Sequence, residues 1–355
     1  MQPIPVVHTS TMVPALRGST LNRRAFFKST AIGAAALAIP GFTLLDGVEP
    51  AFAGTKPTLN SSDVAVLKFL AAAELVEADL WGQYSELATN NPEFRRALQT
   101  IDDSMPDYVT GDFDDETSHA AFINAFLVAA GQDPINLDPF RTLPSVRVEG
   151  AKDIGRLTNL TNLTVDTSYY QRYRGAGNPD FGDTFEQIVN INNQPAVPVS
   201  NSIHGIDMLS IAQTAAFHFA AIEQGGGSLY TSLLTKVTDL DVVAILASIG
   251  PTEIYHFAIF QTAIEGIREL PGANGPTFPD IKDRADKGTI TPHPCTFLDP
   301  SFPPCSVIRP RNTNTAGAVA AATGLVKSGL FEGQSTAFFN AVVALATAAD
   351  AAVRG

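Results

Sequence analysis

The amino-acid sequence predicts an all-α fold built around four long helices, and three observations indicate it. Long stretches repeat apolar residues at three- and four-residue steps, the spacing of a helix with one buried face. Polar capping residues precede these stretches, and Gly, Asn or Pro follows them. A Pro-rich stretch over 132–203 separates them into two pairs. The order predicts a four-helix bundle of two hairpins, with a long crossover between them and a helical extension afterwards.

The first predicted hairpin occupies about 62–131. Its first helix is expected over 62–89, where apolar residues recur along one face and an Asn-Asn-Pro sequence follows. A short helical patch at 94–101 and then a loop lead to a second helix over 113–130, which Gly131 can terminate.

The second predicted hairpin occupies about 204–270, with one helix over 206–236 and another from about 240 to 270. The glycine run at 225–227 costs about 1 kcal/mol per residue relative to alanine inside a helix. It indicates either a break in the helix or a place where a neighbouring helix packs tightly. Pro251 is expected to kink the last helix.

The remaining segments surround these hairpins. Within the crossover at 132–203, short strands are expected at 146–150 and 157–165. A Pro-rich loop opens the segment 271–355, and a final Ala-rich helix or helix pair over about 314–352 is assigned to packing.

The N-terminal segment 1–53 predicts an export signal. Paired arginines in the sequence LNRRAFFK are followed by an apolar run at 31–45 and by a small-x-small cleavage sequence that ends at Ala53. This resembles the bacterial twin-arginine (Tat) signal, although an ordinary secretory or lipid-spanning segment is the alternative. The bundle would then occupy 54–270 of a periplasmic or secreted protein, with the Tat export machinery as its partner.

Charge and cysteine content limit the functions further. The net charge of −13 repels phosphate backbones, so no nucleic-acid partner is expected. We expect no stable membrane span after the signal, and the long crossover and extension favour a monomer or homodimer. Cys295 and Cys305 flank a Pro-rich loop and predict a local disulfide in an oxidising compartment. A zinc site with His293 is the alternative.

Two Glu-x-x-His fragments carry the chemistry. Glu116 and His119 form one, and Glu253 and His256 form the other. Residues three apart share one face of a helix, so each fragment directs a carboxylate and an imidazole to one point. Two such helices, with one inward Glu from each of two more, form the ligand set of di-iron and di-manganese carboxylate proteins. For Glu116 and His119 taken alone, a solvated helix face is the alternative.

The two halves of the chain repeat one order of residues. Glu74 is followed seven residues later by Trp81, as Glu223 is by Tyr230, and a Glu-x-x-His helix comes next in each half. This pseudo-repeat predicts that the four helices surround one axis. His204 is interpreted as a surface or core residue, and so is His218.

This arrangement resembles the ferritin-like superfamily, and more closely the exported ferritin-like-domain proteins related to plant desiccation-related and fungal stress-response proteins. The resemblance extends to about residue 270 and includes the segment 169–183. It implies a ferritin-like four-helix bundle. The metal ligands that it implies are Glu74, Glu116, His119, Glu223, Glu253 and His256, with Glu77 as an alternative to Glu74.

Four carboxylates would neutralise two divalent cations, and carboxylate with imidazole suits iron or manganese. A di-metal oxidoreductase that handles ferrous iron, peroxide or oxygen is one expectation, because this bundle hosts several such reactions. The alternative is a non-catalytic stress or desiccation-related envelope protein with a vestigial metal site.

Overall fold

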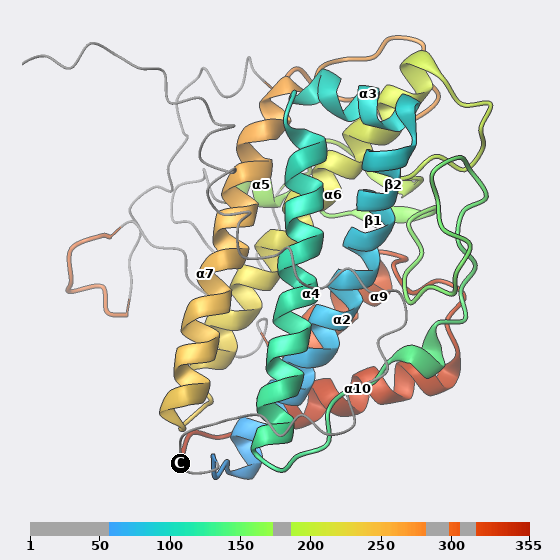
Figure 1. The fold of residues 1–355 in the computed structure, drawn as a ribbon. Coiled ribbons are helices and arrows are strands. Elements are labelled where there is room, and N and C mark those ends of the chain that lie inside the picture. The colour runs from blue at the N-terminus through green and yellow to red at the C-terminus, as the bar shows by residue number, and fades with distance from the viewer. Residues whose placement is uncertain (1–56, 173–185, 282–297, 306–316) are drawn as a thin grey trace, which may run out of the picture. The chain divides into compact units, whose positions relative to one another are not determined.

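The computed structural model describes residues 57–172, 186–281, 298–305 and 317–355. The chain divides into the units Met1–Ala53 and Gly54–Gly355, and the second contains every described residue. Helices dominate this unit, which confirms the all-α class (Figure 1). The twin-arginine segment and Cys295 lie outside the described residues, so the export signal and the disulfide stay predictions.

The first hairpin consists of α2 (Ser61–Asn90), α3 (Pro92–Ile101) and α4 (Met105–Ala129). The start of α2 follows from its cap, because the Asn60 side chain accepts hydrogen bonds from the first backbone N–H groups of the helix. The loop predicted before residue 113 is wrong, since α4 begins two turns earlier.

Two features of the sequence explain the two extra turns of α4. Pro106 stands in the first turn, where a missing N–H costs nothing. Met105, Tyr108 and Val109 bury one face at helical spacing, so core packing favours a helix where the short segment looked irregular.

The second hairpin consists of α6 (Gly205–Leu234) and α7 (Leu240–Ala263), followed by the 3₁₀ turn η2 (Ile264–Gly266). The expected continuation of α7 to residue 270 is wrong. The helix runs through Pro251 without interruption. These two helical runs, Gly205–Leu234 and Leu240–Gly266, are long and apolar enough to span a membrane by length and composition. Core helices of soluble proteins pass the same test, so the absence of a stable span stays a prediction.

The glycine run does not break α6. A Cβ added to Gly226 would collide with the Glu253 carboxylate, and one added to Gly227 would lie 2.5 Å from Ile254 Cδ1. On the facing helix, a Cβ at Gly250 would lie 2.8 Å from Tyr230 Cβ. The glycines therefore serve the second of the two predicted roles, which is close packing of α6 against α7.

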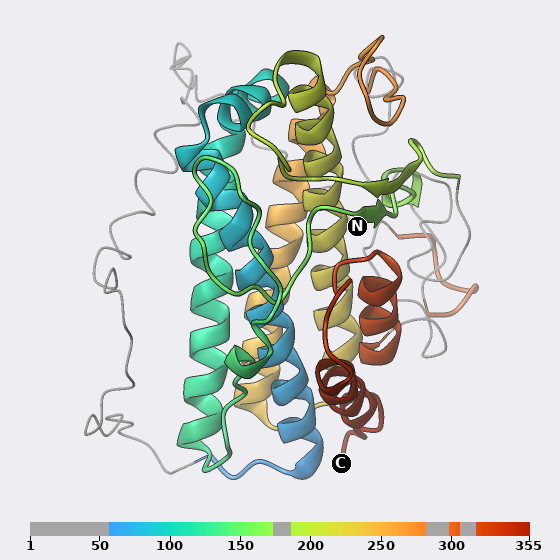
Figure 2. The same cartoon turned by 90° about the vertical axis from the view of Figure 1, so that its right-hand side faces the viewer.

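The four long helices α2, α4, α6 and α7 run side by side, with α2 along α4 and α6 along α7 (Figures 1 and 2). Their interior holds two clusters of buried apolar residues. Trp81, Phe219 and Phe260 belong to the first cluster, and Leu70 and Leu246 belong to the second. The space between these clusters contains the candidate site.

The crossover contains η1 (Asp138–Phe140), β1 (Leu163–Val165), the short α5 (Tyr169–Arg172) and β2 (Ile191–Gln194). The strands β1 and β2 pair antiparallel. The strand expected at 146–150 is wrong, because these residues form turns and irregular backbone.

Two buried acidic residues of α2 hold the crossover against the bundle. Asp79 accepts hydrogen bonds from the backbone N–H groups of Leu157 and Thr158, at 3.0 and 2.9 Å. Two helical turns further along α2, Glu86 lies 2.5 Å from the Arg156 guanidinium. The irregular backbone of the crossover is thus fixed by charged partners on a helix.

The C-terminal extension forms a helix pair, α9 (Ala318–Lys327) and α10 (Thr336–Asp350). Asp350 at the end of α10 accepts hydrogen bonds from Ala318 and Val319, which are the first residues of α9. The pair packs against the bundle, with α10 on α2 and α9 on α6 (Figure 2).

We predict that alanine has opposite effects on stability at Gly225 of α6 and at Gly250 of α7. Gly225→Ala should raise the free energy of unfolding by about 1 kcal/mol, because helix propensity improves and its Cβ meets nothing within 4 Å. Gly250→Ala should lower it, because overpacking against Tyr230 costs about 1–3 kcal/mol. Urea denaturation measures both. Equal shifts in the two variants would contradict the close α6–α7 contact.

Candidate metal centre

The six side chains named by the sequence meet inside the bundle. Glu74 comes from α2 and Glu223 from α6, while each Glu-x-x-His fragment contributes a pair from α4 or α7. Each fragment folds as an uninterrupted helix, so its two side chains leave the same face. His119 keeps 12% of its side chain exposed, and the other five are buried.

The site forms a polar layer between the two apolar clusters. On α6, Ile222 belongs to one cluster and Leu229 to the other, with Glu223 between them. On α7, Ile249 and Phe257 stand likewise on either side of the second fragment. Apolar packing above and below therefore excludes bulk water from the carboxylates.

The six residues form two overlapping groups whose ligand atoms lie within 4.8 Å of one another in each group. Glu116 and Glu253 belong to both groups. The first group is Glu74, Glu116, His119 and Glu253, and the second is Glu116, Glu223, Glu253 and His256. Each group holds three carboxylates and one imidazole.

The distances in the first group fit a shared cation. His119 Nδ1 lies 3.1 Å from a Glu116 oxygen, 3.3 Å from a Glu74 oxygen and 3.6 Å from a Glu253 oxygen. Ligand atoms about 2.1 Å from one ion stand about 3.0–3.4 Å apart in octahedral or tetrahedral geometry. The separations from Glu116 and Glu74 fall within this range, and that from Glu253 is slightly longer.

The second imidazole engages acidic groups at both nitrogens. His256 Nδ1 lies 3.1 Å from Glu223 and 3.3 Å from Glu116. On its other side, Nε2 lies 3.0 Å from the exposed Asp115 and 3.3 Å from the buried Asp112. A metal-ligating imidazole commonly donates its second N–H to a carboxylate, which fixes the ring orientation and tautomer. Asp112 and Asp115 match that role.

Several buried carboxylate oxygens lack a hydrogen-bond donor within the described part of the chain. They are both oxygens of Glu253 and one oxygen of each of Glu74, Glu116 and Glu223. Buried polar atoms are almost always paired, and an unpaired one costs about 1–3 kcal/mol. A shared cation would satisfy these oxygens, as would protons on the carboxyl groups.

The balance of charge gives the same indication. No Lys or Arg of the described segments forms an ion pair with these glutamates. Protonated His119 and His256 would compensate only two of the four carboxylates. The remainder must be neutralised by protons or by metal ions, because isolated buried charges are prohibitively costly.

The directions of the pKa shifts follow from the burial and the charges of the site. Burial, and then repulsion between neighbouring carboxylates, raises the pKa of Glu253 and of Glu116 well above the usual range. For Glu74, burial raises the pKa, but the interactions with His119, Glu116 and Tyr230 together outweigh burial, so its pKa falls. Burial alone would lower the pKa of His119 and His256, yet the acidic neighbours raise both.

Sequence reasoning missed three residues of the site. Asp112 was missed because the first two turns of α4 were expected as loop, and Asp115 was missed because only Glu-x-x-His spacing was sought. The Tyr230 hydroxyl donates a hydrogen bond to Glu74. Its seven-residue distance from Glu223 was a signal, since it places both on one side of α6.

Glu77 belongs to neither ligand group. It lies one turn from Glu74, is half-buried, and lines a cavity between α2 and α6. Burial and then the charge of Glu74 raise its pKa well above the usual range.

Two further histidines lie outside the groups. His204 is exposed. His218 is buried, and its Nδ1 lies 2.8 Å from the Tyr84 hydroxyl. Burial lowers the pKa of His218 to about 3, so the ring is neutral at pH 7.

Comparison with known proteins adds no identification. No family model, curated protein or solved structure matches this chain.

We predict an acid dependence of stability from His218. Its pKa is lower in the folded than in the unfolded chain, so folding is favoured above pH 6.5 and weakened as the pH falls towards 3. Between pH 7 and 4.5 this contributes a loss of about 2–3 kcal/mol. His218→Gln should lack that part of the loss in urea denaturation of metal-free protein. An identical pH profile in both proteins would contradict a neutral buried ring.

Proposed function

We propose that this chain is a ferritin-like four-helix-bundle protein that binds two divalent cations, iron or manganese, in a carboxylate-bridged centre. One observation carries the proposal. Two buried groups of ligand atoms share Glu116 and Glu253, and no positive side chain among the described residues compensates them beyond the two imidazoles. Glu74 with His119 and Glu223 with His256 would each complete the coordination of one ion.

The donor set favours iron or manganese over other cations. Carboxylates alone suit magnesium and calcium, whereas added imidazole favours transition metals, and thiolates are absent from both groups. Bound iron or manganese would supply redox chemistry with ferrous iron, peroxide or oxygen, which makes the protein a candidate di-metal oxidoreductase.

The surrounding residues have definite tasks in this proposal. Asp112 and Asp115 orient His256 through Nε2, and Tyr230 orients Glu74 through its hydroxyl. Apolar clusters on both sides keep water away, so competing hydration of the cations is limited.

Export is proposed together with this function. A Tat-type signal at 1–53 would deliver the folded protein, with its centre already assembled, to the periplasm or the exterior. This part rests on the paired arginines and the cleavage sequence. Conversion of Arg23 and Arg24 to lysines should retain the protein in the cytoplasm, which fractionation and immunoblotting would show.

Metal content tests the centre directly. Native protein should contain about two equivalents of iron or manganese by elemental analysis. Glu253→Gln should lose both ions because it removes a shared ligand, whereas Glu74→Gln should retain one. The control is Glu93→Gln, which should leave both ions, because Glu93 is half-buried on α3 beside Arg96 and belongs to neither ligand group.

Unfolding would also release metal, so the stability of the metal-free proteins is compared as a control. The pKa of Glu253 is raised in the folded chain, so its ionisation weakens folding as the pH rises above 4.5. Metal-free Glu253→Gln should therefore be at least as stable as metal-free native protein at pH 7. Folded native protein that binds neither metal would leave only an architectural or stress-protective role.

A second test uses the backbone behind Glu253. Gly226→Ala should weaken metal binding at least tenfold, because its Cβ would displace the Glu253 carboxylate. Gly225→Ala is the matched control, since it adds the same methyl group one residue away without a contact. Competition with a coloured chelator measures both affinities, and equal values would contradict the assigned ligand.

A further inference from the structure

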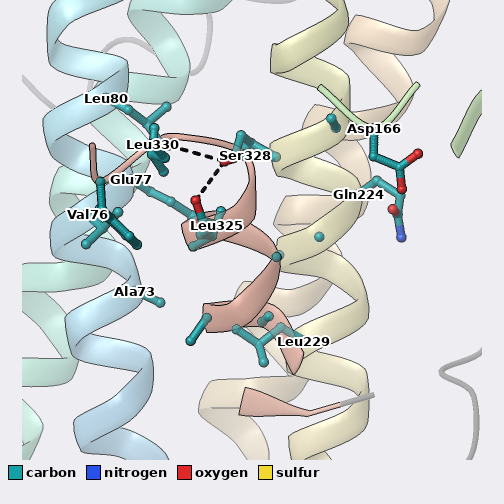
Figure 3. A pocket seen from close by; sticks show the side chains of 18 of the residues that line it. Ala73, Val76, Glu77, Leu80, Asp166, Gln224, Leu229, Leu325, Ser328 and Leu330 are labelled. Atoms are coloured by element: carbon teal, nitrogen blue, oxygen red, sulfur yellow. Dashed lines mark hydrogen bonds between the residues drawn. The ribbon is translucent and has the colours of Figure 1, made fainter. Parts of the chain in front are cut away.

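An apolar cavity of about 550 Å³ lies between α2 and α6, beside the carboxylate layer. The extension α9, the turn that follows it and part of α10 cover this cavity, and β1 closes one side (Figure 3). Its volume is within the range of small-molecule sites, which is about 300–1,000 Å³. It is separate from the two ligand groups, none of whose members lines it.

The cavity is elongated along the helices. On α2 its wall runs from Phe69 to Leu80, a length of about 16 Å at the helical rise of 1.5 Å per residue. Its wall on α6 runs from His218 to Leu229. Figure 3 shows aliphatic side chains of both helices and of α9 around the same space, among them Val76, Leu229 and Leu325. This shape and lining suit an extended apolar molecule.

One buried polar atom in the wall has no hydrogen-bond partner among the described residues. Among the described residues, His218 Nε2 makes no hydrogen bond, whereas Nδ1 faces the Tyr84 hydroxyl. Burial keeps the pKa of Tyr84 high and that of His218 low, so both are neutral at pH 7. With the Tyr84 hydroxyl donating its hydrogen bond to Nδ1, the ring proton of the neutral imidazole is at Nε2. An acceptor oxygen on a bound molecule would satisfy this donor.

The charges on the wall determine the kind of oxygen. The acidic residues that line the cavity are Glu77 and Asp166, and its described lining includes no Lys or Arg. A carboxylate or phosphate head group would lack a counter-charge there. A hydroxyl or carbonyl oxygen meets no such penalty.

The wall towards the metal centre is thin. Gly225 and Gly226 line the cavity, and the Glu253 carboxylate lies directly behind Gly226. A molecule in the cavity would therefore lie one backbone thickness from a shared ligand of the proposed centre.

We propose that this cavity is a binding site for a neutral, extended apolar molecule with one hydroxyl or carbonyl oxygen, which His218 Nε2 recognises. Long-chain alcohols, aldehydes and ketones are the chemical class. Binding is inferred from the cavity alone. Only a role of the bound molecule as a substrate of the metal centre would rest on the proposed function.

Equilibrium dialysis with labelled dodecanol tests the site. Dodecanol should bind in about one equivalent, with dodecane and dodecanoate each about tenfold weaker, because one lacks the oxygen and the other is charged. Tightest binding of dodecanoate, or equal binding of dodecane, would overturn the proposed recognition.

Two variants locate the binding. Gly225→Leu should abolish it, because the new side chain enters open space in the cavity, while Gly111→Leu adds the same side chain to an exposed face of α4 as the control. His218→Phe should weaken dodecanol about tenfold and leave dodecane unchanged. Unaltered dodecanol binding by Gly225→Leu would overturn the site.

Elemental analysis of the same samples separates the two proposals. Gly225→Leu should keep the metal content of native protein, because residue 225 contacts no ligand. Dodecanol binding by protein that never takes up metal supports the cavity site and removes the dinuclear centre. Protein that holds two ions and fails to bind dodecanol overturns the cavity site alone.

Discussion

The burial of four glutamates in one layer is the constraint on which this structure depends. Apolar clusters lie on both sides of the layer, so water cannot solvate the charges. The two imidazoles offset half of the negative charge, and the rest requires protons or cations. Burial, and then repulsion from neighbouring carboxylates, raises the pKa of Glu116 and of Glu253, which stand in both ligand groups. In the proposed centre, the same position would make them ligands of both cations, whose charge would offset the repulsion.

Close helix packing makes that layer geometrically attainable. Glutamate has a short reach, so the backbones that carry it must approach closely. Gly226 and Gly250 provide this approach between α6 and α7, each at a point where a side chain would strike the opposite helix. Glycine inside a helix lowers the stability of that helix. Here Gly226 packs directly against Glu253, which is a ligand of the proposed centre. The loss in helix propensity is therefore a local consequence of the site, and Gly225 is explained differently, by the open cavity that it borders.

The sequence predicted the elements whose period is strong and the residues whose spacing is helical. Glu-x-x-His spacing placed Glu116 with His119 on one face because three residues nearly complete a helical turn. The same spacing did not identify Asp112, because this residue precedes the predicted start of the helix. The true start of α4 was not predicted because Pro106 beside Met105 looked like a turn. Strand prediction at 146–150 failed because those residues have no partner strand in the described crossover, and alternation alone cannot supply one. Helix boundaries and tertiary contacts depend on burial, which a single sequence does not display.

The acidic side chains of α2 face three different parts of the structure: the carboxylate layer, the cavity and the crossover. Glu74 faces the carboxylate layer, while Glu77 faces the cavity one turn away. Asp79 and Glu86, seven residues apart and hence on one side of the helix, hold the crossover. Because α10 packs against the same helix, the extension does more than add apolar contacts: together with α9 it closes the space over Glu77. A bundle without this cover would expose that face of α2 and α6 to water, and the layer behind Gly226 would lose its apolar protection. The extension and the glycines thus act on the same carboxylates in two ways, the extension through solvent exclusion and the glycines through helix spacing.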